Sequence, residues 1–165
     1  MLVQLFMSIS QEDFRAALSR FASGITVVTS VDSEGRLHGM TVSAFCSVSL
    51  EPPLILVCIS TGTGSRQAIA ASKRFAVNVL SENQTELSER FSAPIEDRFS
   101  STEYRSGASG LPLLNGALAN LECRLRQSYE GGDHTIYVGE IESVSLNEGQ
   151  PLLHFRGDYK RMEKP

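Results

Sequence analysis

The stretch LECRLR, residues Leu121–Arg126, alternates apolar and charged side chains at every position. Successive side chains of a β-strand point to opposite faces of a sheet, so the pattern predicts a half-buried antiparallel strand. The apolar residues are expected to face a core and the charged residues to face water. The stretch therefore indicates an antiparallel sheet with one covered face.

The segments on either side of this strand extend the β pattern. Ile25–Val31 is rich in β-branched residues, and the turn sequence DSEG at 32–35 follows it, which predicts a β-hairpin. Pro52 and Pro53 separate two further strands, because proline cannot donate to a ladder. The other expected strands are 37–50, 54–60, 74–80, 117–129, 134–147 and 152–156. Short helices are expected at 11–22, with a capping-box-like start at Ser10, at 65–73 and at 84–91. This balance favours an antiparallel barrel over a layered α/β sheet.

Length and charge set the class of protein. The chain has 165 residues and a net charge of −4, and domains commonly have roughly 100–200 residues. We therefore expect one domain at 10–165 after an N-terminal extension at 1–9. The negative charge argues against a nucleic-acid surface, and no apolar run reaches the roughly 18–20 residues of a membrane span. Three cysteines without a C-x-x-C motif (Cys46, Cys58 and Cys123) indicate reduced, mostly buried thiols in a cytoplasmic protein.

One long segment, 92–116, shows no clean period and contains several Pro and Gly residues among polar ones. Such an excursion in a small domain usually covers a site or has a function of its own.

Small and hydroxylated residues fill the segment Thr41–Ser49 (TVSAFCSVS), where a plain strand would be expected. They would allow a flat ligand to approach the backbone, whose N–H and C=O groups can bond a heteroaromatic edge. The alternative interpretation is a Ser/Thr-rich edge strand that binds nothing.

A second candidate is Ser60–Arg66 (STGTGSR), which lies between an apolar strand and an expected helix. Free N–H groups at a helix N-terminus, with Ser65 as the cap and Arg66 beside it, suit a phosphate. The segment lacks the lysine of a P-loop, and Gln67 stands where a dinucleotide fingerprint needs its third glycine. A capped turn without a ligand is the alternative.

A third candidate is Gly131–His134 (GGDH), a turn between two strands that ends in a histidine at a strand end. A lone turn histidine is often only solvated. The three histidines are not at metal-ligand spacing, and the G-x-S-x-G elbow of a hydrolase is absent, so a metal site and a Ser–His–Asp triad are not predicted.

Taken in order, the motifs TVSAFCSVSLEPPL, S-x-G-x-G-S-R, FAVNVL, DRF, LEC and GGDH resemble the short-chain flavin reductase family, and the resemblance covers residues 11–161. Members of this family are reductase components of two-component flavin-dependent monooxygenases. The resemblance implies a mainly β fold: a split β-barrel of Greek-key antiparallel strands with a few short flanking helices. It also implies a homodimer that binds FMN or FAD near its interface and uses NADH or NADPH as co-substrate.

The resemblance also implies roles for individual residues. The cofactor site would include, largely through the main chain at the isoalloxazine, Thr41, Ser43, Ala44, Phe45 and Ser47. Cys58 and Ser60 would lie beside the ribityl chain, and Ser65 and Arg66 would hold the phosphate. Three further residues would approach the flavin: Asn78, Ser81 and Gln84. His134 is the expected catalytic residue, orienting the nicotinamide, with Tyr159 in the same pocket.

Hydride would then pass from the nicotinamide to the flavin, which diffuses to a partner monooxygenase. Three alternatives remain open: a split barrel that keeps its flavin and passes electrons to another acceptor, a flavin-binding module without turnover, and an apolar-pocket barrel unrelated to flavin. The residues do not decide between FMN and FAD, or between NADH and NADPH.

Overall fold

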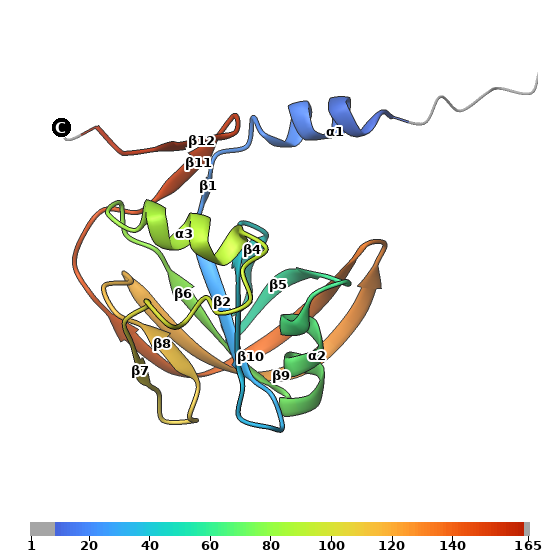
Figure 1. Ribbon diagram of the computed structural model, residues 1–165. Coiled ribbons are helices and arrows are strands. Elements are labelled where there is room, and N and C mark those ends of the chain that lie inside the picture. Colours follow the sequence, from blue (N-terminus) through green and yellow to red (C-terminus); the bar gives the residue numbers. More distant parts are fainter. Residues whose placement is uncertain (1–8, 164–165) are drawn as a thin grey trace, which may run out of the picture.

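The computed structural model describes residues 9–163 (Figure 1). The expected N-terminal extension at 1–9 therefore lies, apart from Ile9, outside the described residues. The helices are α1 (Gln11–Leu18), α2 (Gly64–Ser72) and α3 (Thr85–Ser92). The strands are β1 (Ser23–Gly24), β2 (Thr26–Val31), β3 (Leu37–Val42), β4 (Phe45–Ser49), β5 (Leu54–Ser60), β6 (Arg74–Val79), β7 (Tyr104–Ser106), β8 (Pro112–Leu114), β9 (Ala119–Gly131), β10 (His134–Leu146), β11 (Leu153–Phe155) and β12 (Asp158–Lys160). No helix in this part of the chain is long and apolar enough to cross a membrane.

Seven strands form one antiparallel sheet in the order β3-β2-β6-β9-β10-β5-β4. Its two end strands, β3 and β4, follow each other in sequence and are joined only by Ser43 and Ala44. The sheet must therefore curl until its two end strands lie near each other, which forms a barrel. β3 and β4 do not pair with each other, and we call the line between them the seam. The expected split barrel of antiparallel strands with short flanking helices is confirmed (Figure 1).

Buried side chains fill the barrel and one of its ends. Inside the barrel, Val57, Ile59, Phe75 and Val77 are fully buried and form one cluster. A second cluster includes Phe91 of α3, and this helix covers one end of the barrel (Figure 1). The site therefore rests on a packed scaffold.

The first helix is shorter than the expected 11–22. Ser10 caps it as predicted, accepting from the N–H of Asp13 at 3.0 Å. It ends at Leu18 because the N–H groups of Arg20 and Phe21 bond the carbonyls only three residues earlier, which tightens the final turn. The chain then joins a separate small sheet of β1, β11 and β12. The strand β12 lies outside the predicted segments.

The strand expected at 37–50 is in fact two strands. The N–H of Phe45 bonds the carbonyl of Ser43 at 3.0 Å, and this tight turn interrupts the ladder. The two halves then pair with different strands, β3 with β2 and β4 with β5. Small residues make this break possible, and it creates the seam.

The excursion at 92–116 folds back over the barrel and contains the hairpin β7–β8. Thr29 donates to the carbonyl of Pro112 at 2.6 Å, which ties this hairpin to β2. The segment has a structural role, because its residues Ala108 and Ser109 cover the side chain of Glu122.

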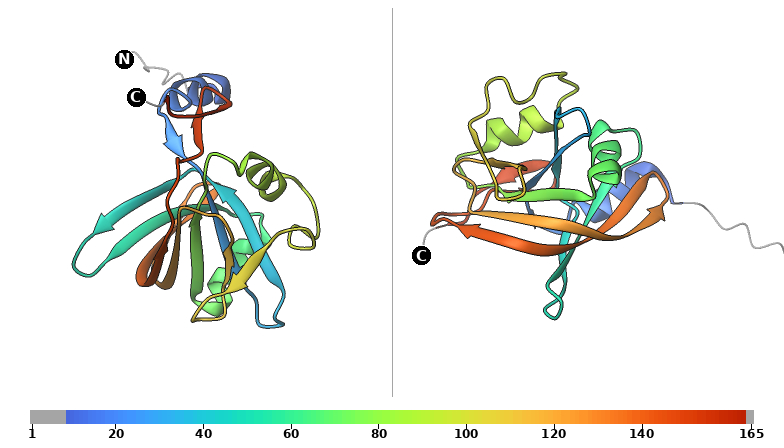
Figure 2. Two further views of the ribbon diagram at one scale, coloured as in Figure 1. Left: turned by 90° about the vertical axis from the view of Figure 1, so that its left-hand side faces the viewer. Right: turned by 90° about the horizontal axis from the view of Figure 1, so that it is seen from below.

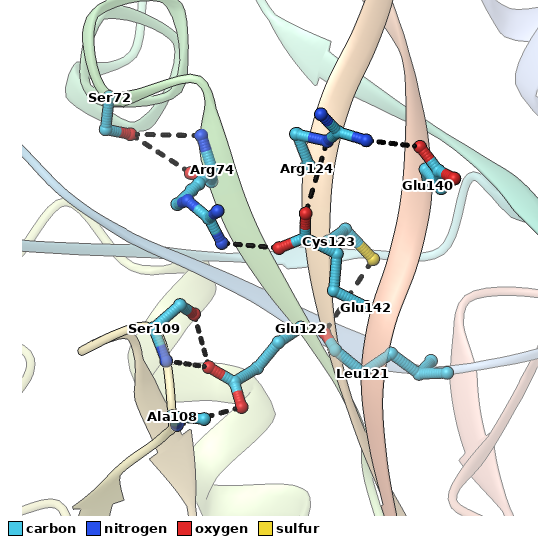
Figure 3. A network of polar contacts seen from close by, with 10 residues as sticks. All are labelled: Ser72, Arg74, Ala108, Ser109, Leu121, Glu122, Cys123, Arg124, Glu140 and Glu142. Carbon is cyan, nitrogen blue, oxygen red and sulfur yellow. Dashed lines mark hydrogen bonds and ion pairs between the residues drawn. The ribbon is translucent and has the colours of Figure 1, made fainter.

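Glu122 was expected to face water with the other charged residues of its strand, and this is wrong. Its side chain is only 3% exposed, and its carboxylate accepts from the N–H groups of Ala108 (3.1 Å) and Ser109 (2.9 Å) and from the Ser109 hydroxyl (Figure 3). Burial alone would raise the pKa of Glu122, but these hydrogen bonds and the charge of Arg105 outweigh it and lower the pKa.

Arg124, in contrast, is exposed and belongs to a ladder of charges on the outer face of β6, β9 and β10. Arg74 contacts Glu142 (2.5 Å), and Arg124 contacts both Glu142 (3.2 Å) and Glu140 (3.0 Å) (Figure 3). Arg126 also contacts Glu140 (3.2 Å). Single exposed ion pairs contribute little, whereas a connected network holds the strands in one register.

Candidate functional site

The seam of the barrel brings together the first group of predicted residues. Ser43 and Ala44 are exposed, and the carbonyl of Ala44 accepts from the N–H of Cys58 at 3.1 Å, which fixes the connection against β5. β3 and β4 each have a strand partner on one side only, so their outer edges carry open N–H and C=O groups among the described residues. A flat ligand with hydrogen-bonding edges can reach this backbone.

A groove of about 940 Å³ lies beside this connection. One wall contains Ser43, Ala44 and Phe45. The opposite wall is α1 with its apolar side chains, and His154 also lines the space. Ligand sites commonly have about 300–1,000 Å³, so the groove is large enough for a nucleotide.

The start of α2 forms the second group. Thr63, rather than the expected Ser65, is the cap, because its hydroxyl accepts from the N–H of Arg66 at 3.4 Å. Ser65 is 6% exposed as a whole residue. Its backbone N–H lies in the first turn of the helix, where it has no partner within the helix.

Arg66 is held in place by the barrel strand β10. Its Nε donates to Oγ1 of Thr135 at 2.9 Å, and its carbonyl accepts from the hydroxyl of Tyr137 at 3.1 Å. Within residues 9–163 it makes no ion pair with a carboxylate. A positioned but uncompensated guanidinium at a helix N-terminus suits a phosphate group.

Cys58 and Ser60 connect the two groups along β5. Both side chains are half-buried and lie on the outer face of the strand, since Val57 and Ile59, which alternate with them, face the core. Burial raises the pKa of the Cys58 thiol, so it is protonated at neutral pH. Ser47, on the neighbouring β4, is exposed.

The cysteines are less buried than expected. Cys123 is buried, and burial together with the nearby Glu142 and Glu122 raises its pKa to about 12. Cys46 is exposed because it lies on the outer face of the end strand β4.

The two residues expected in a nicotinamide pocket lie at different ends of the site. His134 is paired with Ser60 in the ladder, and its Nδ1 donates to the Asp133 carboxylate at 2.7 Å. This hydrogen bond and the charge of His134 lower the pKa of Asp133.

Tyr159 lies toward the other end of the site, where its hydroxyl is 2.9 Å from Oγ of Ser88. The Ser88 carbonyl accepts from Thr41 at 2.6 Å. Among the described residues, no hydrogen bond joins His134 to Tyr159.

Three predicted cofactor residues have structural partners instead. Asn78 is fully buried, and its amide bonds the carbonyl of Val27 (2.9 Å), the N–H of Leu114 (2.9 Å) and the amide of Asn120 (2.8 Å). Gln84 accepts from the N–H of Ser81 (3.0 Å) and donates to the carbonyl of Asn115 (2.8 Å). Asn78 is therefore corrected to a core residue, and Ser81 and Gln84 stabilise the turn before α3.

Residue patterns did not identify the α1 wall of the groove or His154. The spacing of Phe14, Leu18 and Phe21 predicts an apolar helix face, and such a face normally indicates a core. In the structure α1 has no buried residue, so the same signal marks the wall of a groove.

The groove at the seam of the barrel and the uncompensated arginine at the adjacent helix are the two features that a flat ligand with a phosphate group requires. Residues 18–163 match the family described as "Flavin reductase like domain", and the chain belongs to this family. It is therefore a flavin reductase domain, an oxidoreductase of the NAD(P)H:flavin type.

Named relatives agree with this assignment. The chain is 40% identical over 158 residues to the reductase subunit HsaB of a flavin-dependent monooxygenase from Mycobacterium tuberculosis. This match covers 94% of this chain and 84% of that protein. It is 39% identical over 145 residues, or 88% of its length, to a "Probable flavin reductase" from Rhizobium meliloti, and it spans only about half (47%) of that relative.

A solved structure has the same fold. The NADH:FAD oxidoreductase of Streptomyces globisporus in complex with NAD and FAD fragments matches with a TM-score of 0.89 and 36% identity, covering 93% of each chain.

Proposed function

We propose that this protein transfers a hydride from NADH or NADPH to FMN or FAD and releases the reduced flavin to a partner monooxygenase. The observation that carries the proposal is the order in which the candidate residues follow one another along β5. This order begins at the open backbone of Ser43–Phe45, passes the half-buried Cys58 and Ser60, and ends at Arg66.

These residues fit a flavin mononucleotide unit. Open backbone groups at the seam match the hydrogen-bonding edge of a flat ring, and the uncompensated Arg66 with the first turn of α2 matches a phosphate. A bound flavin supplies the hydride acceptor, which is chemistry that no side chain here provides.

The chain itself supplies binding and orientation. Arg66 and the N–H groups of the first α2 turn hold the phosphate, while the Ser43–Phe45 backbone fixes the ring. His134, held by Asp133 at the end of β10, orients the nicotinamide by hydrogen bonding. The chain has no dinucleotide fingerprint, so the nicotinamide nucleotide binds shallowly and exchanges readily.

The partner, the assembly and the location belong to the same proposal. The reductase-subunit name of the M. tuberculosis relative supports a monooxygenase partner reached by diffusing reduced flavin. We propose a homodimer, because a wall of the groove is formed by a helix without buried residues. The protein is proposed to be cytoplasmic, in keeping with its unpaired cysteines.

The test is to mix the purified full chain with NADH or NADPH and excess FMN or FAD without oxygen, and to follow oxidation of the nicotinamide. Many turnovers of free flavin support the proposal. Reduction of one equivalent only indicates a permanently bound flavin that serves another acceptor. Flavin binding without reduction indicates a non-catalytic module, and absence of flavin binding contradicts the proposal altogether.

A further inference from the structure

A further cavity, which we call the β3 recess, lies at the start of β3, at the opposite end of that strand from the seam. It has a volume of about 370 Å³. Its inner wall is Arg36–Gly39, and its outer wall is Glu96–Phe99, from the chain that follows α3 and runs alongside β3 (Figure 2). Phe99 fixes the outer wall, because its ring packs edge-on against Phe91 with the centroids 5.1 Å apart. The recess is therefore built from packed elements and has the size of a small-ligand site.

His38 connects the β3 recess to the candidate phosphate site. Its Nε2 lies 2.9 Å from Oδ2 of Asp32, and its Nδ1 faces the start of α2. A Cβ at Gly64 would lie only 2.9 Å from this Nδ1, so the imidazole contacts the first residue of the helix. A ligand whose phosphate lies at the first turn of α2 is thus separated from the recess by a single side chain.

The outer edge of β3 extends from the seam toward the recess. β3 is an end strand of the sheet, so its backbone groups on this side have no strand partner. Leu37 is its first residue and Ser43 follows its last, and six residues of strand extend over about 20 Å. A flavin with its ring at Ser43 and its phosphate at α2 therefore directs the phosphate end toward the recess.

Arg98 is the cation of the recess whose charge is not offset. One of its terminal N–H groups donates to the carbonyl of Ala93 at 2.7 Å, and its Nε is buried without a hydrogen-bond partner in the described part of the chain. It forms no ion pair there either. Arg36, in contrast, pairs with Asp32 (2.9 Å) and Glu34 (3.2 Å). A guanidinium that is held in place but not paired suits a phosphate.

The remaining lining fits a nucleoside. The Asp97 carboxylate is occupied by the N–H groups of Phe99 (3.1 Å) and Ser100 (3.0 Å), whereas Glu96 is exposed and makes no ion pair among the described residues. A free carboxylate accepts from ribose hydroxyls and repels a phosphate attached to the ribose. Leu37 offers half-buried apolar surface to a base. The lining therefore favours a nucleoside 5′-monophosphate without a second phosphate.

We propose, building on the flavin site of the proposed function, that the β3 recess binds the adenylate half of FAD, with Arg98 on its phosphate and Glu96 on its ribose. FMN has no group that reaches the recess, so FAD is the preferred flavin. NADH carries the same adenylate group, but the position of the recess beyond the flavin phosphate assigns it to the flavin.

The test compares the dissociation constants of FAD and FMN for the full chain by fluorescence titration. We expect the wild type to bind FAD about tenfold more tightly than FMN, and Arg98→Gln to remove this preference by weakening FAD alone, since a charge-assisted hydrogen bond has about this value. Arg98→Lys keeps the charge and should retain part of the preference. Arg126→Gln is the matched control, because Arg126 lies on the outer face of β9 with Glu140, and it should change neither constant.

A second variant covers the case in which Arg98→Gln does not fold, since Arg98 also holds the carbonyl of Ala93. Leu37→Trp keeps Arg98 and fills the recess with a larger ring, and it should weaken FAD about tenfold and leave FMN unchanged. Circular dichroism and thermal melting verify that each variant folds. Wild-type affinities that are equal for FAD and FMN, or variants that weaken both flavins equally, overturn the proposal.

Two further measurements separate the ligands and the two proposals. An Arg98→Gln variant that raises the KM for NADH and leaves FAD binding unchanged assigns the recess to the co-substrate and overturns the assignment to FAD. Calorimetric titration with 5′-AMP alone examines the recess without flavin, and Arg98→Gln should weaken this binding about tenfold. If 5′-AMP binds in this way and no flavin is reduced, the proposed function fails and the adenylate site stands. If FMN and FAD are reduced equally and 5′-AMP does not bind, the adenylate site fails and the proposed function stands.

Discussion

The Nε of Arg66 donates a hydrogen bond of 2.9 Å to Oγ1 of Thr135, so the helix that begins at the candidate phosphate site is joined to the barrel strand that carries His134. One guanidinium N–H is used for this contact and the remaining N–H groups are available to a ligand. Thr135 thereby positions the arginine.

We expect Arg66→Ala to weaken binding of FMN and FAD by about 1.5–3 kcal/mol, the value of a charge-assisted hydrogen bond, and to leave riboflavin binding nearly unchanged. Fluorescence titration of the three flavins measures the difference. Thr135→Val is the companion variant and should give a smaller loss in the same direction. Equal weakening of all three flavins would remove Arg66 from the phosphate site.

His134→Ala should raise the KM for the nicotinamide nucleotide or slow hydride transfer, because the histidine is proposed to orient that co-substrate. Steady-state and stopped-flow measurements with NADH and NADPH separate the two effects. Asp133→Asn keeps the imidazole but weakens its hydrogen-bond acceptor, so a milder change of the same kind is expected. The proposed role is wrong if His134→Ala changes neither quantity.

Asn78→Ala should destabilise the fold and leave the flavin affinity of the folded protein unchanged. The amide of Asn78 satisfies the carbonyl of Val27 and the N–H of Leu114 in the core, and each buried group left without a partner costs about 1–3 kcal/mol. Urea unfolding gives the stability, and a flavin titration under native conditions gives the affinity. A stable variant with weakened flavin binding would return Asn78 to the cofactor site.

Glu122→Gln should lower the free energy of unfolding at neutral pH by about 1.5–3 kcal/mol, since hydrogen bonds to a charged acceptor have this value. Folding lowers the pKa of Glu122 below its ordinary value of 4.5. The stabilisation is therefore complete above pH 4.5 and is lost as the pH falls through the folded-state pKa.

The difference in free energy of unfolding between the wild type and Glu122→Gln should thus be constant above pH 4.5 and become smaller as the pH falls below it. Thermal melts across the acid range measure this difference. A difference that widens in acid would contradict this account.

Local patterns predicted the elements of the barrel because each carries its own signal. The β-branched run at Thr26–Val31, the turn after it and the capped start of α1 at Ser10 depend on neighbours in the sequence, and all three occur as expected. The break at Ser43–Ala44 was missed because it depends on which strands lie on either side of the seam. That information is held by pairings with residues far away in the chain.

The same contrast between local signals and long-range contacts applies to the candidate site. Arg66 and the seam residues lie in motifs that can be recognised in the sequence. Asn78 lies in a motif too, but its burial is decided by the β7–β8 hairpin, which supplies Leu114 from a segment without periodicity. The same segment buries Glu122, whose alternating neighbours indicate a solvent-facing position. Tertiary cover of this kind overrides an alternation pattern.

The ladder of charges on the outer face constrains the evolution of this sequence. It consists of Arg74, Glu142, Arg124, Glu140 and Arg126. Reversing the sign at Glu142 alone would place like charges beside both Arg74 and Arg124, so a tolerated reversal has to be accompanied by changes at its neighbours. Members of the family are expected to show correlated substitutions at these five positions, with the alternation of sign preserved and the individual residues exchanged.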